Sequence, residues 1–258
     1  MLTKIIYPLS LRQKISGRLQ KFLPDVNAKD IRLEFSKNIR MDLSKNDVGH
    51  KSIILNGFYE LDLTRMIVKL ARQGRVLFDV GANYGYFSCL WTSQNPLNKA
   101  YSFEASPNNI QPLRNNVKKN KLSDKITVVP MAMGKEPGKL KFDLAIDNQQ
   151  TGWGGFVLNS TSNAVEVQVD TLDNYAKQNN ITTIDVLKID VEGADTWVLY
   201  GATELLKEKK IRHIFFEHNF PRMKLLNIGE DDAKGFLKEH GYVLERKTQS
   251  DFYAYPGK

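Results

Sequence analysis

Residues 79–87 read DVGANYGYF and stand between a short apolar strand and a predicted helix. Glycines in such a turn let the backbone approach a ligand, and the N–H groups at the helix start attract an anion. The spacing of Gly81 and Gly85 is G-x-x-x-G, with Asn83 in the place of a middle glycine, which disfavours a dinucleotide pyrophosphate. We therefore expect the turn to hold the zwitterionic end of a cofactor, with Asp79 accepting hydrogen bonds from its amino group.

A carboxylate, Glu104, ends the next predicted strand. Doubly wound folds carry at this place the acid that binds the two hydroxyls of a ribose. Ser106 follows as the N-cap of a helix that has a proline at its first position. An adenine would then lie beside the end of the third strand, near Met133. Glu104, Ser106 and Met133 are accordingly predicted cofactor-binding residues.

From residue 75 onward, strand-like and helix-like segments alternate, which is typical of a parallel sheet covered by helices on both faces. The predicted fold class is therefore α/β, with a doubly wound sheet. The expected strands are residues 76–78, 100–103, 126–131, 186–189, 213–216, 243–246 and 252–255. Residues 134–169 interrupt the alternation with glycine, asparagine and glutamine between β-prone pieces, and they predict an inserted hairpin and loop.

The N-terminal segment carries most of the excess positive charge. The chain has a formal net charge of +8, and residues 1–51 contain 11 Lys and Arg against 5 Asp and Glu. The apolar residues at helical spacing in this segment are Leu11, Ile15, Leu19, Phe22 and Leu23, with basic residues between them. A basic amphipathic helix of this kind caps the main domain with its apolar stripe, or lies on an anionic membrane surface or against a partner.

Two parts are predicted along the chain. Residues 25–58 read as short extended pieces. A basic extension, an amphipathic helix with short strands, is therefore expected over residues 1–54 and the main domain over residues 55–258. No apolar run reaches the roughly 18 residues that a membrane-spanning helix needs, and the single cysteine, Cys89, cannot form an internal disulfide. These features predict a cytoplasmic protein, with peripheral contact at the inner face of a membrane as a further expectation.

Three segments in this order resemble the FkbM family of S-adenosylmethionine-dependent methyltransferases: Glu60 with the tyrosine before it, DVGANYGYF at 79–87, and KIDVEGA at 188–194. The resemblance covers about residues 55–256. It implies a class I, Rossmann-like methyltransferase fold of seven strands with the last strand antiparallel. It also implies S-adenosylmethionine as the donor, S-adenosylhomocysteine as the product, and O-methylation, often of sugars or glycosylated natural products. By resemblance, Glu60 meets the methionyl part of the cofactor and Phe87 belongs to the cofactor site.

Catalytic residues are expected at the carboxyl ends of the fourth and fifth predicted strands, because the acceptor needs a base there. A sugar hydroxyl is a poor nucleophile until a base or a metal takes its proton. Asp190 and Glu192 follow the fourth strand and His218 follows the fifth, so all three are predicted catalytic residues, and Asp190 is also assigned to the cofactor. Lys188 is expected to pair with one of the acids. A divalent metal on Asp190 and Glu192 is an alternative that is not favoured.

The sequence thus predicts a methyltransferase that acts on a hydroxyl of a sugar, a glycan or a glycosylated metabolite. Methylation of RNA or of a protein is the first alternative, because of the basic N-terminal helix, although nucleic acid is not the favoured partner. The second alternative is a non-catalytic binding module on the same fold. The glycine-rich stretch around Trp153 is expected to form a lid over the acceptor.

Overall fold

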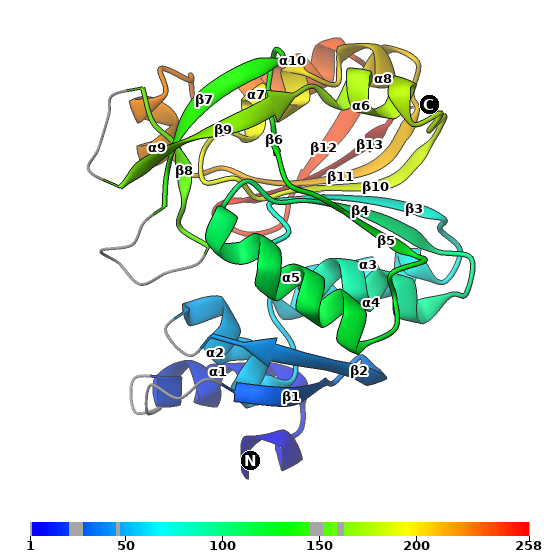
Figure 1. Cartoon of the computed structure of the whole chain (residues 1–258), viewed down its shortest axis with the longest axis vertical. Helices are drawn as coiled ribbons and strands as arrows, with labels where there is room; N and C mark the ends of the chain where they lie inside the picture. The colour runs from blue at the N-terminus through cyan, green and yellow to red at the C-terminus, as the bar shows by residue number, and fades with distance from the viewer. Residues whose placement is uncertain (1, 21–27, 45–46, 145–151, 159–162, 258) are drawn as a thin grey trace.

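The computed structural model describes residues 2–20, 28–44, 47–144, 152–158 and 163–257. Within these ranges a central seven-stranded sheet has the order β12-β13-β11-β10-β3-β4-β5 (Figure 1). Its strands are β3 (Val76–Val80), β4 (Lys99–Phe103), β5 (Ile126–Val129), β10 (Ile184–Ile189), β11 (Ile211–Glu217), β12 (Tyr242–Arg246) and β13 (Asp251–Pro256). The neighbours from β11 to β5 are parallel, and β13 is antiparallel to both β11 and β12. The predicted sheet, with its last strand antiparallel, is confirmed.

Helices cover both faces of this sheet (Figure 1). One face carries α3 (Leu61–Ala71), α4 (Tyr86–Gln94) and α5 (Pro107–Lys119), and the other carries α6 (Leu172–Gln178), α7 (Asp195–Tyr200), α8 (Thr203–Lys207) and α10 (Asp232–Glu239). A short helix, α9 (Phe220–Leu225), follows β11. Because successive side chains of a strand point to opposite faces, Leu77 enters the core on the α4 side and Phe78 enters the core on the α6 side.

The segment between β5 and α6 forms a second sheet beside the central one (Figure 1). In the described ranges its order is β6-β9-β7-β8, with β6 (Ala132–Met133), β7 (Gly138–Asp143), β8 (Gly155–Phe156) and β9 (Ala164–Asp170). β7 and β9 pair antiparallel, with Gly138 opposite Val169 and Asp143 opposite Ala164. The predicted hairpin is therefore confirmed as the centre of a small sheet.

The N-terminal extension packs against the face that carries α4 and α5 (Figure 1). It consists of η1 (Leu2–Ile5), α1 (Leu9–Leu19), β1 (Ala28–Leu33), β2 (Ser36–Leu43) and α2 (Val48–Asn56). Met41 and Ile53 belong to the same buried cluster as Ile67 of α3 and Leu90 of α4. This part of the extension and the main domain therefore share one hydrophobic core.

The extended interpretation of residues 25–58 is wrong over α2. The Asp47 carboxylate accepts the N–H of His50 at 2.8 Å and caps the start of the helix, and Gly57 follows its end in the left-handed region with a φ of 80°. Residues 53–55 are all buried, so this helix lacks the amphipathic spacing by which a helix is recognised in a sequence.

Helix α1 packs against the rest of the extension with a face that contains polar residues. Arg12 and Ser16 are buried, and the Arg12 guanidinium donates to main-chain carbonyls and forms an ion pair with Glu34 at 2.7 Å. Leu11 and Leu19, in contrast, are 44% and 42% exposed. The expectation that the apolar stripe caps the main domain is wrong for these two leucines, because a guanidinium that satisfies several buried carbonyls packs inside instead.

Two further members of the predicted stripe, Phe22 and Leu23, lie outside the residues that the structure describes. Ile15, the remaining member, is partly buried. Of the helices that are described, none combines the length and the apolar character needed to span a bilayer.

Candidate active site

The turn expected to hold a cofactor joins β3 to α4. Gly81 has a φ of +76°, and a Cβ atom at this position would overlap the carbonyl oxygen of Asp190. The N–H groups of Gly81 and Ala82 both donate to the carbonyl of Phe103 at 3.0 Å. Asn83 has a φ of 49°, a left-handed conformation that asparagine tolerates. The ends of β3, β4 and β10 therefore meet around this turn, and only glycine fits at its start.

Glu104 lies directly after β4 and is almost completely buried. Its Oε2 accepts the N–H of Asn83 at 2.7 Å, and its Oε1 accepts the N–H of Ser106 at 2.8 Å. Burial raises the pKa of this carboxyl to about 7, against the lowering effect of these hydrogen bonds. Glu104 lines a narrow cavity of about 70 Å³, the slot, together with apolar side chains such as Met133 and Phe156. The slot thus combines an ionisable group with an apolar wall.

Behind the turn, Lys188 of β10 is surrounded by acids. Its Nζ lies 3.6 Å from Asp79 Oδ1 and 3.3 Å from Asp190 Oδ2, and it donates to the carbonyl of Gly81 at 3.0 Å. Burial acts to lower the pKa of Lys188, but the surrounding carboxylates, first that of Asp190, raise it above its ordinary value. Lys188 therefore stays charged and holds the carbonyl side of the turn. The predicted pairing of this lysine with a neighbouring acid is confirmed.

A cavity of about 540 Å³, the main cavity, lies beside the turn. Its wall comes from β2 and α2, from the starts of α3 and α4, and from the segments after β10 and β11. Its lining residues include Met41, Leu43, Asp47, His50, Tyr59, Glu60, Gly81, Asn83, Phe87, Trp153, Lys188, Asp190, Glu192, Glu217 and Arg222. A side cavity of about 500 Å³, lined by residues of α3, β11 and β13, shares Glu60, Asp190 and Glu217 with it. These three acids stand where the two cavities meet.

Three carboxyl groups of the main cavity have pKa values near neutrality, namely those of Glu60, Glu192 and Glu217. Glu192 Oε2 accepts the Nδ2–H of Asn219 at 3.0 Å and lies 3.5 Å from Nε of Arg222. Burial, and then the charge of Asp190, raises the pKa of Glu192 to about 7. The same two causes raise the pKa of Glu217 to about 8, and none of the described residues donates a hydrogen bond to its carboxyl group. A carboxyl group with a pKa near the working pH suits a general base.

Glu60 precedes α3 in the left-handed region, with a φ of 40°. Burial, and then Asp190, raises its pKa to about 7, and its carboxyl group is hydrogen-bonded to Tyr59. Strained non-glycine residues of this kind collect at functional sites. The structure places Glu60 on the same cavity as Gly81.

The positions of His218 and His50 differ from those expected from the sequence. The ring of His218 packs against Phe220 and Phe252, its buried Nε2 has no hydrogen-bond partner among the described residues, and burial lowers its pKa. His218 lines none of the three cavities. His50, to which the sequence assigned no role, does line the main cavity, with its ring 4.4 Å from that of Tyr84.

Most of the other residues assigned from the sequence gather on the two cavities. Those of them that line the main cavity are Glu60, Gly81, Asn83, Phe87, Asp190 and Glu192. Those that line the slot include Glu104 and Met133. Asp79, Gly85 and Ser106 line none of the cavities. Asp79 is 1% exposed and its Oδ2 accepts the hydroxyl of Ser88 at 2.7 Å, so its burial argues against the direct contact with an amino group that the sequence led us to expect.

Sequence reasoning missed Glu217, Asp47 and Arg222, all of which line the main cavity. Glu217 had a usable signal, because it ends the same strand that His218 follows. Asp47 and Arg222 lie on elements without a motif. Among the described residues, no group of three or more His, Cys, Asp and Glu side chains is arranged to hold a metal ion.

Comparisons with known proteins identify the family of the chain. Residues 79–244 match the family model described as the methyltransferase FkbM domain. The chain is 26% identical over 150 residues to the hexuronic acid methyltransferase AglP of Haloferax volcanii, a match that covers 57% of this chain and spans only 58% of that relative.

A solved methyltransferase structure shows the same fold. The methyltransferase domain of METTL16 superposes with a TM-score of 0.51 at 14% identity, covering 96% of this chain and 80% of that one. A putative caffeoyl-CoA O-methyltransferase from Staphylococcus aureus gives a TM-score of 0.49 at 12% identity, covering 76% and 82%. Together with the strand order, the METTL16 match confirms the predicted class I, Rossmann-like fold.

Proposed function

Because the chain belongs to the FkbM methyltransferase family and is therefore a methyltransferase, we propose that it methylates a hydroxyl group of a sugar, a glycan or a glycosylated metabolite, with S-adenosylmethionine as the donor. The observation that carries the proposal is the pair Glu192 and Glu217, whose pKa values of about 7 and about 8 provide a proton acceptor beside the glycine turn. A hydroxyl group needs such an acceptor, since it is a poor nucleophile while it keeps its proton.

The slot and the turn have the groups that this donor requires. Oε2 of Glu104 accepts one main-chain N–H and keeps a further lone pair for one hydroxyl of a ribose. Oε1 accepts the N–H of Ser106 and, in a long contact of 3.5 Å, Nδ2 of Asn109, which the second hydroxyl can replace. Met133 and Phe156 suit the flat face of an adenine. The missing Cβ at Gly81 lets a ligand approach the main chain. When bound, S-adenosylmethionine supplies a methyl carbon on a positively charged sulfur, which needs alignment with its acceptor more than covalent help.

The residues of the protein itself supply the proton transfer. The carboxylate of Glu217 is placed to take the proton of the acceptor hydroxyl, which turns that oxygen into a competent nucleophile. Glu192, held by its two partners, is placed to accept a hydrogen bond from a second hydroxyl and so to orient the acceptor. Asp190 lines the slot and both larger cavities, so it stands between the donor and acceptor sides, and Lys188 keeps it in place.

Three findings support a sugar acceptor over a nucleic acid. The relative from Haloferax volcanii is named a hexuronic acid methyltransferase, and a cavity of about 540 Å³ is in the range of small-molecule sites. The acidic residues in the described lining are Asp47, Glu60, Asp190, Glu192 and Glu217, and the Lys and Arg residues are Lys188 and Arg222. Nucleic acids bind where Lys and Arg neutralise phosphates, so this lining opposes an RNA strand.

Glu104→Ala is expected to weaken the binding of S-adenosylhomocysteine about 100-fold or more, because two hydrogen bonds to a charged group are lost. Calorimetric titration of the full chain measures this dissociation constant. Glu166→Ala is the matched control, since Glu166 is a surface carboxylate paired with Lys139, and it leaves the constant unchanged. Equal affinity of Glu104→Ala and the parent would contradict the ribose assignment. A parent protein that does not bind S-adenosylhomocysteine would overturn the proposed donor.

The same carboxyl group gives a pH dependence. Its pKa in the protein is about 7, and the hydroxyls of a ribose donate to its ionised form. The affinity for S-adenosylhomocysteine is therefore expected to fall as the pH decreases through about 7. Glu104→Gln, which stays neutral at every pH, is expected to bind weakly and to lose this dependence in the same titration.

We also propose that α1 contacts an anionic membrane surface. Leu11 and Leu19 are exposed, and the basic residues Lys14 and Arg18 stand on the neighbouring stripe of the helix. An exposed apolar stripe flanked by basic side chains suits a helix that lies in the plane of a membrane interface.

Replacing both Lys14 and Arg18 by alanine is expected to weaken binding to phosphatidylserine-containing vesicles about 30-fold, from about 1 kcal/mol per basic residue. Sedimentation of the full chain with vesicles of defined composition measures the partition. The matched control replaces Lys177 and Lys224, exposed lysines of α6 and α9, and retains parental binding. Parental binding by the α1 variant, or equal binding to uncharged vesicles, would refute the contact.

A further inference from the structure

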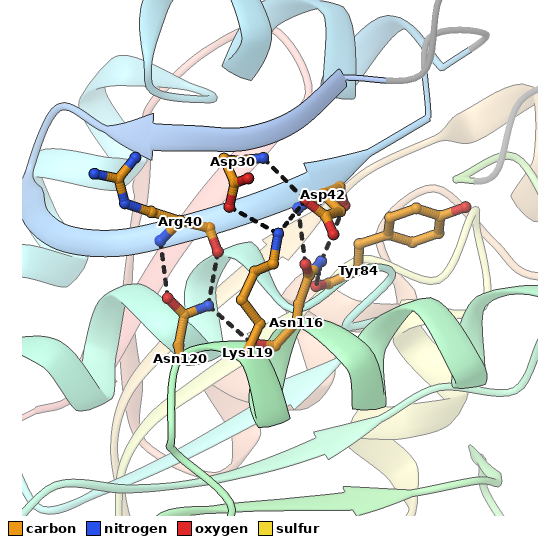
Figure 2. Close-up of polar contacts among 7 residues, drawn as sticks. All are labelled: Asp30, Arg40, Asp42, Tyr84, Asn116, Lys119 and Asn120. Carbon is orange, nitrogen blue, oxygen red and sulfur yellow. Dashed lines mark hydrogen bonds and ion pairs between the residues drawn. The ribbon is translucent and has the colours of Figure 1, made fainter.

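Two asparagines pair with one edge of β2 (Figure 2). The N–H of Arg40 donates to Asn120 Oδ1 at 2.8 Å, and Asn120 Nδ2 donates back to the Arg40 carbonyl at 2.7 Å. Asn116 of α5, one helical turn earlier, makes the same pair with Asp42, at 2.8 Å and 3.1 Å. The amide side chains therefore take the place of a neighbouring strand along the edge of β2 that β1 does not cover.

Asn116 also makes a bond that Asn120 does not. Its Nδ2 donates to the carbonyl of Tyr84 at 3.0 Å, inside the glycine turn (Figure 2). The two hydrogens of one amide nitrogen thus serve Asp42 and Tyr84 at the same time. Asn116 is 1% exposed, so these partners have no water to replace it. One buried side chain on α5 therefore joins the hairpin of the extension to the turn assigned to the donor.

This link bears on the main cavity, because β2 and α2 form one of its walls. The lining residues that they and the segment between them supply are Met41, Leu43, Asp47, Val48, Gly49, His50 and Ile53. All of them lie outside the residues that match the family model. The ring of Tyr84 also contacts His50 of this wall, at 4.4 Å between centroids. The turn and the wall therefore meet at Tyr84, whose main chain Asn116 holds.

We propose that Asn116 is a positioning residue that holds the extension, as the acceptor-side wall of the active site, in register with the donor-binding turn. The proposal rests on the proposed function for the assignment of the two sides. Methyl transfer depends on alignment of the two reacting atoms, and a misplacement of about 1 Å costs on the order of 100-fold in rate. Selection of the acceptor then resides in the described residues 41–44 and 47–53 of the extension, whose position is set from α5.

The test compares Asn116→Ala with Asn120→Ala in the full chain. Both variants remove a pair of hydrogen bonds to β2, but only Asn116→Ala releases the Tyr84 carbonyl. The dissociation constant of S-adenosylhomocysteine is expected to rise about tenfold in Asn116→Ala, from the loss of one buried hydrogen bond at the turn. It stays within about twofold of the parental value in Asn120→Ala. Calorimetry at a temperature where both variants are folded gives these constants.

Amide hydrogen exchange distinguishes a positioning role of Asn116 from a contribution to stability alone. In the parent, S-adenosylhomocysteine is expected to slow exchange in the glycine turn and also in β2 and α2, because Asn116 connects them. In Asn120→Ala this protection still reaches β2. In Asn116→Ala it stops at the turn. If Asn116→Ala does not fold, Asn116→Asp keeps the acceptor for Asp42 while removing both donors, and the same loss of protection in β2 is expected.

The outcomes separate the two proposals. A parent that binds S-adenosylhomocysteine, with identical affinity and identical spread of protection in Asn116→Ala and Asn120→Ala, would overturn the positioning role and leave the proposed function intact. A parent that does not bind S-adenosylhomocysteine would overturn the proposed function itself, and with it the assignment of a donor side.

Discussion

A Glu217→Gln variant is expected to lose a factor of about 10² to 10⁴ in kcat while binding S-adenosylhomocysteine as tightly as the parent. The amide has the shape of the carboxylate but accepts no proton, and Glu217 lines both larger cavities with a carboxyl group free to face the acceptor. The measurement is the transfer of a labelled methyl group to a panel of free sugars and uronic acids. Glu239→Gln, an exposed carboxylate of α10, is the matched control with parental kcat.

The pKa of about 8 sets the expected pH profile of this reaction. Only the ionised carboxylate accepts a proton, so kcat/KM of the parent is expected to rise as the pH increases through about 8, and Glu217→Gln is expected to lose this rise.

The contribution of Glu217 to folding stability changes with pH in the opposite direction to kcat/KM. The pKa of Glu217 is raised from 4.5, so the folded state binds this proton more tightly than the unfolded state. The corresponding contribution to the free energy of unfolding is fully present below about pH 4.5 and is lost as the pH rises through about 8. Thermal unfolding of Glu217→Gln is therefore expected at a higher temperature than that of the parent above about pH 8.

His218 provides the contrasting result. Its ring packs between aromatic residues and lines none of the three cavities described above, so His218→Ala is expected to retain most of the parental kcat/KM and the rise with pH. Parental activity in Glu217→Gln, combined with loss of activity in His218→Ala, would transfer the role of base to the histidine.

Gly81→Ala is expected to remove both the folded stability of the turn and the donor site. The new Cβ would overlap the carbonyl oxygen of Asp190, which is main chain and cannot rotate away, and alanine also resists a φ of +76°. The expected loss in the free energy of unfolding exceeds about 4 kcal/mol, which places it among the most damaging single substitutions. Urea unfolding gives this loss, and calorimetry is expected to detect no binding of S-adenosylhomocysteine.

Gly241→Ala isolates the contribution of backbone strain. Gly241 has a similar φ of +66°, but its nearest neighbour is the Nζ atom at the end of the flexible Lys209 side chain. We expect a loss of about 1–2 kcal/mol, from the left-handed conformation alone, with parental donor affinity. If Gly81→Ala were no more destabilising than Gly241→Ala, the close approach of β3 and β10 around Gly81 would not be a requirement of the fold.

The sequence predicted well those features that depend on residues close together in the chain. The turn at residues 79–87 and the carboxylate after β4 follow from glycine spacing and from the end of an apolar strand. Prediction failed where the local pattern was ambiguous. α2 has buried residues on several sides, and α1 buries Arg12 because the distant carbonyl of Asn56 and the carboxylate of Glu34 contact its guanidinium, together with the nearby carbonyl of Ile6.

Glu217 and His218 show most directly where prediction from the sequence fails. They are adjacent in the chain and both stand at the end of β11, so position alone does not choose between them. Successive side chains of an extended segment point in different directions, and the packing of Phe220 and Phe252 draws the histidine away from the cavity. Burial among Asp190 and other acids, which sets the pKa of the glutamate, involves residues that are remote in sequence.

The sequence by itself determined the alternation of strands and helices, the glycine turn and the acid that follows β4, because propensity, spacing and turn chemistry act between residues that are close in the chain. Only the tertiary structure decided which carboxyl groups share a cavity, and how the extension becomes a wall of that cavity through Asn116. Burial, electrostatic coupling and side-chain direction depend on contacts between distant segments, and these contacts exist only in the folded chain.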